Sequence, residues 1–508
     1  MNHVLVIGAG PAGLAAARAA RGQGASVTLL DSSDQLGGQF WRHLPGSRPA
    51  ARERILHHGW DTFQALSNAL ESDNGCRIIR SAQVFALEHR PEAAERTAVT
   101  RPTPGPGTVH VVVGASDGVG RERLSFSPDA IVLATGAHDR TLPFPGWDLP
   151  GVFTGGAAQA LAKGERLAVG RRVVVGGAGP FLLPVAASLA ATGSRVLGVY
   201  EANRMPALIR GWLPKPWQLL GASSKGAELA GYAAGQIRNR IPYRLGRAVV
   251  AAHGGERVES VTVASLSADW TPIPGTERRI AADAVCVSHG FTPRLELAIA
   301  AGCALTPERF VRVDDAQRSN VPGVYAAGEI TGIGGVDLAL AEGAIAGHAA
   351  AGGHAGDPKL RESMRKRSVF RGFAARIEHA HGIRPGWPQM LTPATVVCRC
   401  EEVTYGHLCA MAESTGSRSL RAMKLSTRAG LGICQGRICG RSVETLLAGC
   451  VAGGVLGDDV STDRRPIAAP IRLGELAAPA IERDAPPPGS TIESSTKEST
   501  EEPTKGRK

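Results

Sequence analysis

The sequence predicts an α/β protein built from two nested Rossmann-type dinucleotide-binding folds, followed by a small helical domain near the C-terminus. Three observations lead to this prediction. A glycine-rich turn at residues 8–13 follows the first apolar strand, a second one at residues 176–180 follows a later strand, and five of the nine cysteines lie between Cys398 and Cys439. Strand, glycine turn and helix in this order form the dinucleotide-binding unit of parallel sheets.

The composition is that of a globular protein that binds anionic ligands. The chain has 508 residues, 43% of them hydrophobic and 20% charged, which leaves room for roughly two to four domains. Its formal net charge of +11 favours anionic cofactors or acidic partners, and we expect no nucleic-acid partner. No apolar run is long enough for a transmembrane segment, and the N-terminus is expected to begin with a strand rather than a signal peptide.

The first dinucleotide fold has all of its parts in order. An apolar strand at residues 4–7 leads into the glycine turn and a helix, and a second strand ends at Asp31. Gly8 permits the tight turn, Gly10 lets a pyrophosphate approach the backbone, and Gly13 lets helix and strand pack closely, while Asp31 is placed to accept from a ribose diol. The predicted cofactor contacts are Gly8, Gly10, Pro11, Ala12, Gly13 and Asp31, with Gly38 and Gln39 of the loop that follows.

Two later segments indicate that this cofactor is FAD rather than NAD. A strand from residue 130 ends in Ala134-Thr135-Gly136, and residues 321–335 contain Gly328-Glu329 and Gly335 before another helix. The second segment resembles the C-terminal FAD motif of the glutathione-reductase superfamily, with Glu329 where Asp is usual. The two halves of the predicted FAD site are far apart in sequence and must meet in space.

A second nucleotide fold is predicted inside the first, in a degraded form. A strand at residues 172–175 leads to the turn that holds Gly177 and Gly179, and the next strand ends at Glu201. Leu182 replaces the third glycine, so helix and strand pack less closely. Glu201 would accept from a ribose diol and repel a 2′-phosphate, which favours NAD(H) or another adenine nucleotide over NADP. The alternative is a retained scaffold without a working site.

The C-terminal cysteines have the spacing of a metal site. Cys398 and Cys400 are separated by 33 residues from Cys434, which is followed by Cys439. Two short-spaced pairs can supply four thiolates to a [2Fe–2S] cluster, and structural zinc is the competing interpretation. Cys409 and Cys450 are not expected to be ligands, and the absence of a secretory signal argues against structural disulfides. Three solitary cysteines, Cys76, Cys286 and Cys303, offer no redox pair for a disulfide reductase.

These features predict the following domain organisation. We expect a discontinuous FAD-binding domain over residues 1–160 and 280–385, a second dinucleotide-binding domain over 165–280, and a [2Fe–2S] domain over 390–455. A docking extension over 456–479 and a disordered tail over 480–508 complete the chain. The stretch 203–250 carries eight Lys or Arg and one acid; it is interpreted as a basic connection, with a docking surface as the alternative.

With these motifs in hand, the chain resembles a family of flavoprotein subunits. It is similar to the A subunit of octopine and nopaline oxidases, to the FAD-containing B subunit of hydrogen cyanide synthase, and to the alpha subunits of heteromeric proline or D-hydroxyproline dehydrogenases. The C-terminal module resembles the bacterioferredoxin-associated-ferredoxin type of [2Fe–2S] domain. The resemblance covers residues 1 to about 476 and rests on the motifs above, together with Leu142-Pro-Phe-Pro-Gly146 and Thr427-Arg-Ala-Gly-Leu-Gly432.

The resemblance implies oxidation of a C–N bond in an amino or imino acid, such as an opine, proline, hydroxyproline, sarcosine or glycine. It also implies that the partner is a second flavin-containing beta subunit, and a small ferredoxin-like subunit is a further candidate. Two alternatives stay open: an NAD(P)H-dependent reductase that feeds a redox partner through the cluster, and a non-catalytic relay and assembly subunit. The expected location is cytoplasmic. Association with the cytoplasmic face of the membrane is expected only through the electron acceptor. No catalytic residue can be named; His138 and His289 are interpreted as structural.

Overall fold

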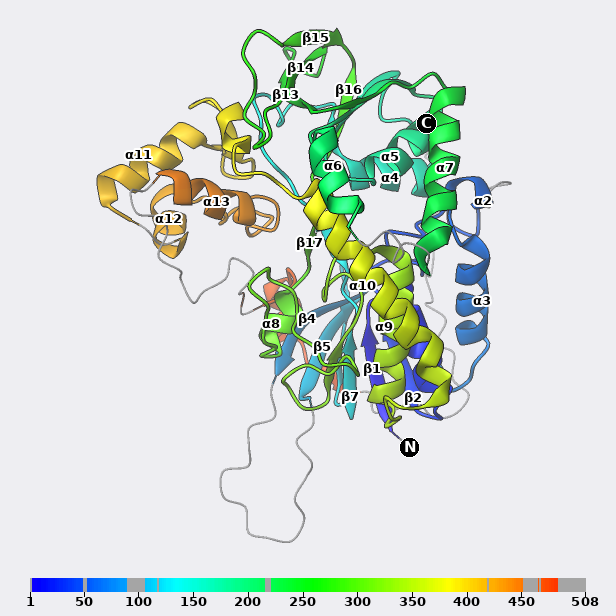
Figure 1. The fold of residues 1–508 in the computed structure, drawn as a ribbon. Coiled ribbons are helices and arrows are strands. Elements are labelled where there is room, and N and C mark those ends of the chain that lie inside the picture. Colours follow the sequence, from blue (N-terminus) through cyan, green and yellow to red (C-terminus); the bar gives the residue numbers. More distant parts are fainter. Residues whose placement is uncertain are drawn as a thin grey trace, which may run out of the picture.

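The computed structural model describes residues 2–48, 53–88, 106–116, 118–214, 221–417, 420–450, 465 and 467–482 (Figure 1). Residues 456–464 and 466 of the predicted docking extension and 483–508 of the predicted tail lie outside this range. The predicted α/β fold class is confirmed, with two parallel sheets and a helical C-terminal module.

The first parallel sheet joins segments from both ends of the chain. Its order is β18-β7-β1-β2-β3, and each neighbouring pair is parallel. Because side chains alternate along a strand, the sheet buries apolar groups on both faces. The strands are β1 (His3–Ile7), β2 (Ser26–Leu30), β3 (Cys76–Ile79), β7 (Ala130–Leu133) and β18 (Val324–Ala326).

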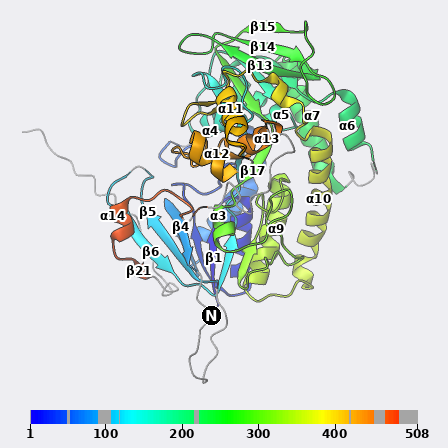
Figure 2. The same ribbon diagram turned by 90° about the vertical axis from the view of Figure 1, so that its left-hand side faces the viewer.

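The two faces of this sheet are covered by different layers, as Figure 2 shows. On one face Val4 and Val6 pack among helices α1 and α9, and on the other Leu5 and Ile7 pack against a mixed sheet of order β21-β6-β5-β4, in which β21 is parallel to β6 and the other pairs are antiparallel. The helices are α1 (Pro11–Arg21), α2 (Glu53–Leu56), α3 (Trp60–Glu71) and α9 (Gly335–Ala350). The strands are β4 (Ala82–Glu88), β5 (Thr108–Val113), β6 (Glu122–Phe126) and β21 (Ile481–Glu482), the last drawn from the start of the predicted tail.

Helices α1 and α9 touch through their backbones. A Cβ on Gly343 would lie 2.1 Å from the carbonyl oxygen of Ala12, and one on Gly347 would lie 1.9 Å from that of Ala16. Glycine in these two positions of α9 is therefore required for the contact. This contact places the start of α9 beside the turn that precedes α1.

The second parallel sheet has the order β12-β11-β10-β16-β9 and lies above the first in Figure 1. Val173 and Val175 face α5, while Val174 and Val285 face a three-stranded antiparallel sheet. The strands are β9 (Val152–Thr154), β10 (Arg172–Gly177), β11 (Arg195–Glu201), β12 (Tyr243–Leu245) and β16 (Ala284–Ser288), with β13 (Arg247–His253), β14 (Ser260–Ser265) and β15 (Arg278–Ala281). The helices are α4 (Gly155–Gly164), α5 (Leu182–Ala191), α6 (Met205–Trp212) and α7 (Ser223–Arg238). The stretch expected to be a basic connection thus contains two helices.

Two elements join the parallel sheets. An antiparallel ribbon pairs β8 (Ala137–Asp139) with β17 (Phe291–Pro293). Helix α10 (Arg361–His381) begins next to α9 and runs across to α6 (Figure 1). The short elements η2 (Pro358–Leu360), η3 (Trp387–Met390), α8 (Glu296–Ala300) and α14 (Leu473–Ala477) lie on these connections and on the chain end.

The C-terminal module is a short hairpin followed by three helices. Its core contains Leu408, Met423, Val443 and Leu446, all buried. Its elements are β19 (Val396–Cys398), β20 (Val403–Thr404), α11 (Tyr405–Thr415), α12 (Leu420–Thr427) and α13 (Gly440–Cys450). Within the part of the chain that the structure describes, no helix is long and apolar enough to cross a membrane.

We expect Gly347→Ala to destabilise the protein by about 1–3 kcal/mol, because the added methyl group overlaps the backbone of α1. The matched control is Gly231→Ala in α7, where nothing lies within 4 Å of the new methyl group and alanine favours the helix by about 1 kcal/mol. Thermal unfolding, followed by circular dichroism and flavin release, checks both. Equal melting temperatures for the two variants would contradict the inferred contact between α1 and α9.

Candidate functional site

The glycine turn after β1 is surrounded by the other predicted FAD segments. Gly8 has a φ of +104°, and a Cβ there would lie 2.3 Å from the carbonyl oxygen of Ala134. A Cβ on Gly38 would lie 2.9 Å from the Cα of Gly10. The turn, the end of β7 and the loop at residues 37–39 therefore meet at the carboxyl edge of the sheet, where such folds bind nucleotides.

Asp31 lies at the end of β2 with its carboxylate turned toward this turn. It accepts from the backbone N–H of Ala9 at 2.5 Å and from that of Ser33 at 2.8 Å. Burial raises the pKa of Asp31, while these hydrogen bonds and the charges of Arg294 and Arg42 oppose the shift. Each carboxylate oxygen can accept a second hydrogen bond, so Asp31 can hold the turn and a ribose hydroxyl together.

A polar cavity of about 130 Å³ lies along the loop that follows Asp31 and reaches Gly164 and Glu165. Its lining includes Ser33, Gln35, Gly38 and Arg42. Arg42 offers a positive charge to an anionic group near the glycine turn. Sequence reasoning missed Arg42, although its position directly after the loop at residues 37–39 was a signal.

The C-terminal half of the predicted FAD site, residues 328–335, is held in place by contacts with α1 and α9. A Cβ on Gly328 would lie 2.8 Å from the Cβ of Ala12 in α1. Glu329 accepts from the backbone N–H of Gly335 at 2.8 Å, and burial raises the pKa of Glu329 to about 7. Glu342 accepts from the N–H of Gly328 at 3.0 Å. The contact between α1 and α9 thus fixes residues 328–335 next to residues 8–13.

Gln39 and the other predicted contacts of the first fold lie on the same three segments. Thr135 donates through its hydroxyl to the carbonyl of Arg294 at 2.8 Å, and Gly136 accepts from the N–H of Arg294 at 2.9 Å. Ala12 is buried in α1 and Pro11 is the first residue of that helix. The arrangement fits an extended dinucleotide, since the backbone N–H groups at the start of α1 can bind phosphate.

The second dinucleotide fold keeps its geometry, but its acid is already engaged. Glu201 is fully buried and accepts from the N–H of Gly179 at 2.8 Å and from the side-chain amide of Asn203 at 2.9 Å. The hydroxyl of Tyr243 also donates to it at 3.3 Å. Gly177 adjoins β16, because a Cβ there would lie 1.8 Å from the carbonyl oxygen of Ser288.

The last turn of α10 covers this site. The Nδ1 of His381 lies 3.4 Å from Glu201, and its Cβ is the nearest group to a Cβ built on Gly179, at 3.9 Å. Trp212 of α6 donates to the Nε2 of His381 at 3.3 Å. Although burial opposes ionisation of Glu201, hydrogen bonds from His381, Asn203 and Gly179 keep its pKa below the ordinary value. His381 therefore lies where a nucleotide ribose would approach Glu201.

The four predicted cluster ligands lie together at the start of the C-terminal module. Cys398 and Cys439 are buried, Cys434 is half-buried and Cys400 is exposed. Cys439 donates to Cys398 and to Cys434, which lowers the pKa of both acceptors and raises that of Cys439. Cys400 contacts Cys434 in turn. Thiol contacts thus run from Cys398 through Cys439 and Cys434 to Cys400.

Backbone amides surround these sulfurs. The N–H of Gly430 points at the sulfur of Cys398 at 3.5 Å, and the amides of Gly436 and Ile438 stabilise the thiolate of Cys434. Such N–H groups stabilise thiolates and tune a cluster's potential. Among the described residues no three ligand side chains already surround a single-ion site.

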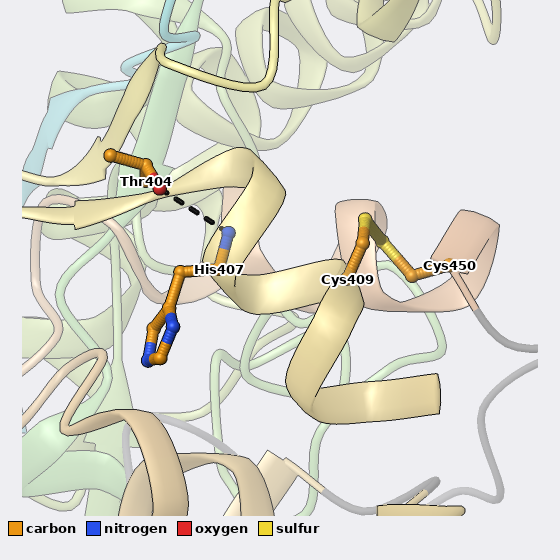
Figure 3. Close-up of a disulfide and its surroundings, with 4 residues drawn as sticks. All are labelled: Thr404, His407, Cys409 and Cys450. Carbon is orange, nitrogen blue, oxygen red and sulfur yellow. Dashed lines mark hydrogen bonds between the residues drawn. A yellow bond between two sulfur atoms is a disulfide. The ribbon is translucent and has the colours of Figure 1, made fainter. Parts of the chain in front are cut away.

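Cys409 and Cys450 lie apart from this group and form a disulfide (Figure 3). The expectation of no structural disulfide is wrong for this pair. Helices α11 and α13 pack side by side, which brings the two Cα atoms within 5.1 Å across 41 residues of sequence. The expectation rested on the absence of a secretory signal, which indicates a reducing compartment, whereas the pairing follows from the packing of α11 against α13. The hydroxyl of Thr404 caps α11 by accepting from the N–H of His407 (Figure 3).

The two histidines singled out by sequence occupy different surroundings. His138 of β8 donates from Nε2 to the carbonyl of Arg437 at 2.9 Å, within the loop between Cys434 and Cys439. His289, after β16, is half-buried, and desolvation lowers its pKa to about 4. Cys286 and Cys303 are buried, and Cys76 is half-buried in β3.

Fold and site define this chain as a flavoprotein with an attached iron–sulfur domain. It belongs to the pyridine nucleotide-disulphide oxidoreductase family, whose model matches residues 2–347, and a BFD-like [2Fe-2S] binding domain matches residues 396–449. The cofactors are accordingly FAD and a [2Fe–2S] cluster, so the interpretation of the cysteine module as a cluster domain is confirmed.

The particular relatives include subunits of opine oxidase and of hydrogen cyanide synthase, as the resemblance indicated. The chain is 33% identical to the A subunit of opine oxidase from Agrobacterium tumefaciens (strain Ach5), over 93% of this chain and 91% of that protein. It is 29% identical to hydrogen cyanide synthase subunit HcnB of Pseudomonas protegens, over 86% and 89%. The crystal structure of L-proline dehydrogenase from P. horikoshii shares the fold, with a TM-score of 0.60, 19% identity and coverage of 94% and 80%.

We expect Cys398→Ser and Cys434→Ser each to abolish the cluster, because each removes a predicted thiolate ligand. Cys409→Ser and Cys450→Ser should keep it, since their disulfide lies outside the ligand group. Iron and labile sulfide, measured per chain with the visible spectrum, check the four variants. Loss of iron in Cys409→Ser with retention in Cys434→Ser would refute the assignment.

Proposed function

We propose that this chain is the FAD- and [2Fe–2S]-containing subunit of a heteromeric dehydrogenase or oxidase acting on an amino or imino acid. The single observation that carries the proposal is the 33% identity to the A subunit of opine oxidase across both domains. The donor is then a CH–NH or CH–NH₂ group of an opine, proline, hydroxyproline, sarcosine or glycine. Oxidation removes two electrons and two protons from the C–N bond and leaves an imine, which water hydrolyses.

The residues of this chain bind and separate the two redox centres. When bound, FAD supplies two-electron chemistry and the [2Fe–2S] cluster supplies one-electron transfer. Asp31 and the turn at residues 8–13 would hold the adenosine diphosphate half of FAD, and Glu329 would accept a hydrogen bond from its ribityl chain. Cys398, Cys400, Cys434 and Cys439 hold the cluster. Such a pair of centres can divide a two-electron oxidation into single-electron steps toward an acceptor.

A partner subunit is supported by an uncovered helical face. Of the described side chains of α7 only that of Gln236 is buried, and a helix of this length is marginal without tertiary packing. Leu229 is 52% exposed and Ile237 is 79% exposed. This face carries exposed apolar groups beside basic ones, which fits a partner with an acidic rim. The exposed apolar residues in the described part of 204–244 include Met205, Ile209, Leu213, Leu229 and Ile237, and its exposed arginines include Arg204, Arg210, Arg238, Arg240 and Arg244.

We place the substrate in this partner, a second flavin-containing subunit, and assign this chain the relay of electrons. A small ferredoxin-like subunit is a further candidate partner. In this assignment no side chain of the present chain is needed as the general base. A chain that relays electrons but binds no amine also accommodates the alternative of a non-catalytic assembly subunit.

The NADH-dependent reductase is the second candidate function, and the cover over Glu201 argues against it. A dinucleotide would have to displace His381 and Trp212 before its ribose could reach Glu201 or its pyrophosphate could reach Gly179. The degraded third glycine position, Leu182, points the same way. We therefore propose that Gly177, Gly179 and Glu201 hold a closed site for NAD(H) or another adenine nucleotide.

An anaerobic absorbance titration tests the main proposal. We expect proline, hydroxyproline, sarcosine, glycine or octopine to bleach the flavin only when the chain is co-purified with its partner subunits. Because the substrate is placed in the partner, the isolated chain should stay oxidised. Bleaching of the isolated chain by an amine would move the substrate site here, and failure of every amine with partners present would reject the donor class.

A second titration tests the closed nucleotide site. We expect NADH to leave the flavin oxidised in the wild-type chain and calorimetry to detect no binding. His381→Ala should gain measurable NADH or ADP-ribose binding, because it uncovers Glu201. His379→Ala is the matched control, since His379 is exposed in the same helix and its ring hydrogen-bonds to the carbonyl of Ala375 in its own helix. Rapid bleaching of the wild type by NADH would favour the reductase.

A further inference from the structure

The ribbon that joins the two large domains also touches the cluster loop. β8 follows the Ala134-Thr135-Gly136 turn directly and pairs with β17, with His138 opposite Thr292. In Figure 2 the C-terminal helices lie beside β17. The flavin-side turn and the cluster module are therefore neighbours, although hundreds of residues separate them in sequence.

One hydrogen bond connects the ribbon to the loop that holds the sulfurs. His138 donates from Nε2 to the carbonyl oxygen of Arg437 at 2.9 Å. Arg437 lies between Cys434 and Cys439, and its own N–H donates to the carbonyl of Cys434 at 3.0 Å. Two peptide units separate the accepting carbonyl from Cys439. The contact therefore acts on the backbone that positions two predicted ligands.

Other contacts dock the same module from different directions. The guanidinium of Arg437 binds Glu296 of α8 at 2.7 Å. The hydroxyl of Ser442 in α13 donates to the carbonyl of Thr141 at 2.5 Å. Arg465, from the end of the chain, donates to the carbonyl of Gln435 in the cluster loop at 3.1 Å. His138 differs from these residues because it joins the main chain of the loop to the strand that leaves the flavin turn.

We propose that His138 is a positioning residue for electron transfer between the flavin and the cluster of this chain. Its hydrogen bond keeps the Cys434–Cys439 loop against β8. The path from Gly136 to Cys439 then runs along β8, through the imidazole of His138 and its hydrogen bond, and into the loop. In the step it supports, a one-electron-reduced flavin is oxidised and the oxidised cluster is reduced, with no other reactant. The proposal needs both cofactors but neither the amine nor the partner subunit of the proposed function.

The test is flash photoreduction of the isolated holoprotein, with a deazaflavin and a sacrificial amine donor as reductant. The decay of reduced flavin and the loss of cluster absorbance give the intramolecular rate. We expect His138→Ala to keep its flavin, iron and sulfide contents and to lower this rate about tenfold, because the cluster loop is no longer held against β8. His138→Gln, which keeps an N–H donor at a similar reach, should recover most of the rate.

Two controls separate this role from general docking. His253→Ala removes a histidine bonded to Thr262 in the β13–β14 sheet, and it should leave the rate unchanged. Ser442→Ala removes a docking hydrogen bond that does not reach the cluster loop, and it should change the rate much less than His138→Ala. An unchanged rate in His138→Ala, or an equal loss in Ser442→Ala, overturns the proposal. If His138→Ala loses iron, the His138→Gln rate decides: a wild-type rate supports the proposal and a slow one overturns it.

Discussion

The backbone contact between α1 and α9 is the constraint on which the cofactor site depends. Gly343 and Gly347 carry no side chain, so α9 lies directly on the carbonyls of Ala12 and Ala16. This contact sets the start of α9, and with it residues 328–335, beside the glycine turn after β1. α10 then begins next to α9 and reaches the second domain, where its last turn covers the other nucleotide fold. The close approach of α1 and α9 therefore sets the first nucleotide fold, and α10, which packs on α9, reaches from there to the second.

The two folds show how the same local pattern acquires different accessibility. Asp31 and Glu201 each end a β-strand and each accept from a backbone N–H of the neighbouring glycine turn. Asp31 is 8% exposed and precedes Ser33 and Gln35, which line a polar cavity together with Arg42, whereas Glu201 is fully buried beneath His381. The difference arises from the elements that lie above each strand end. The hydrogen bonds of the buried Glu201 carboxylate are already made, so exchanging them for a ribose brings no gain in stability unless the covering residues move.

The flavin site and the cluster site lie on one chain and are also connected by contacts within the fold. The cysteine loop contacts the β8–β17 ribbon, and the ribbon starts at the turn beside the first glycine loop. Flavin and cluster sites therefore belong to one packed body rather than to two tethered domains, which suits a relay of electrons. The exposed apolar and basic residues of α6 and α7 belong to other elements than β8, β17 and the cysteine loop.

The sequence by itself determined the fold class, the two glycine turns and the grouping of the four cysteines. These features are local: a strand, a turn and a helix within about 30 residues, or cysteines a few positions apart, have few geometric alternatives. Only the tertiary structure decided the cover of His381 over Glu201, the bond from His138 to the cluster loop, and the disulfide between Cys409 and Cys450. Each joins residues on separate elements, and their meeting depends on how whole helices and domains pack, which no spacing in the sequence records.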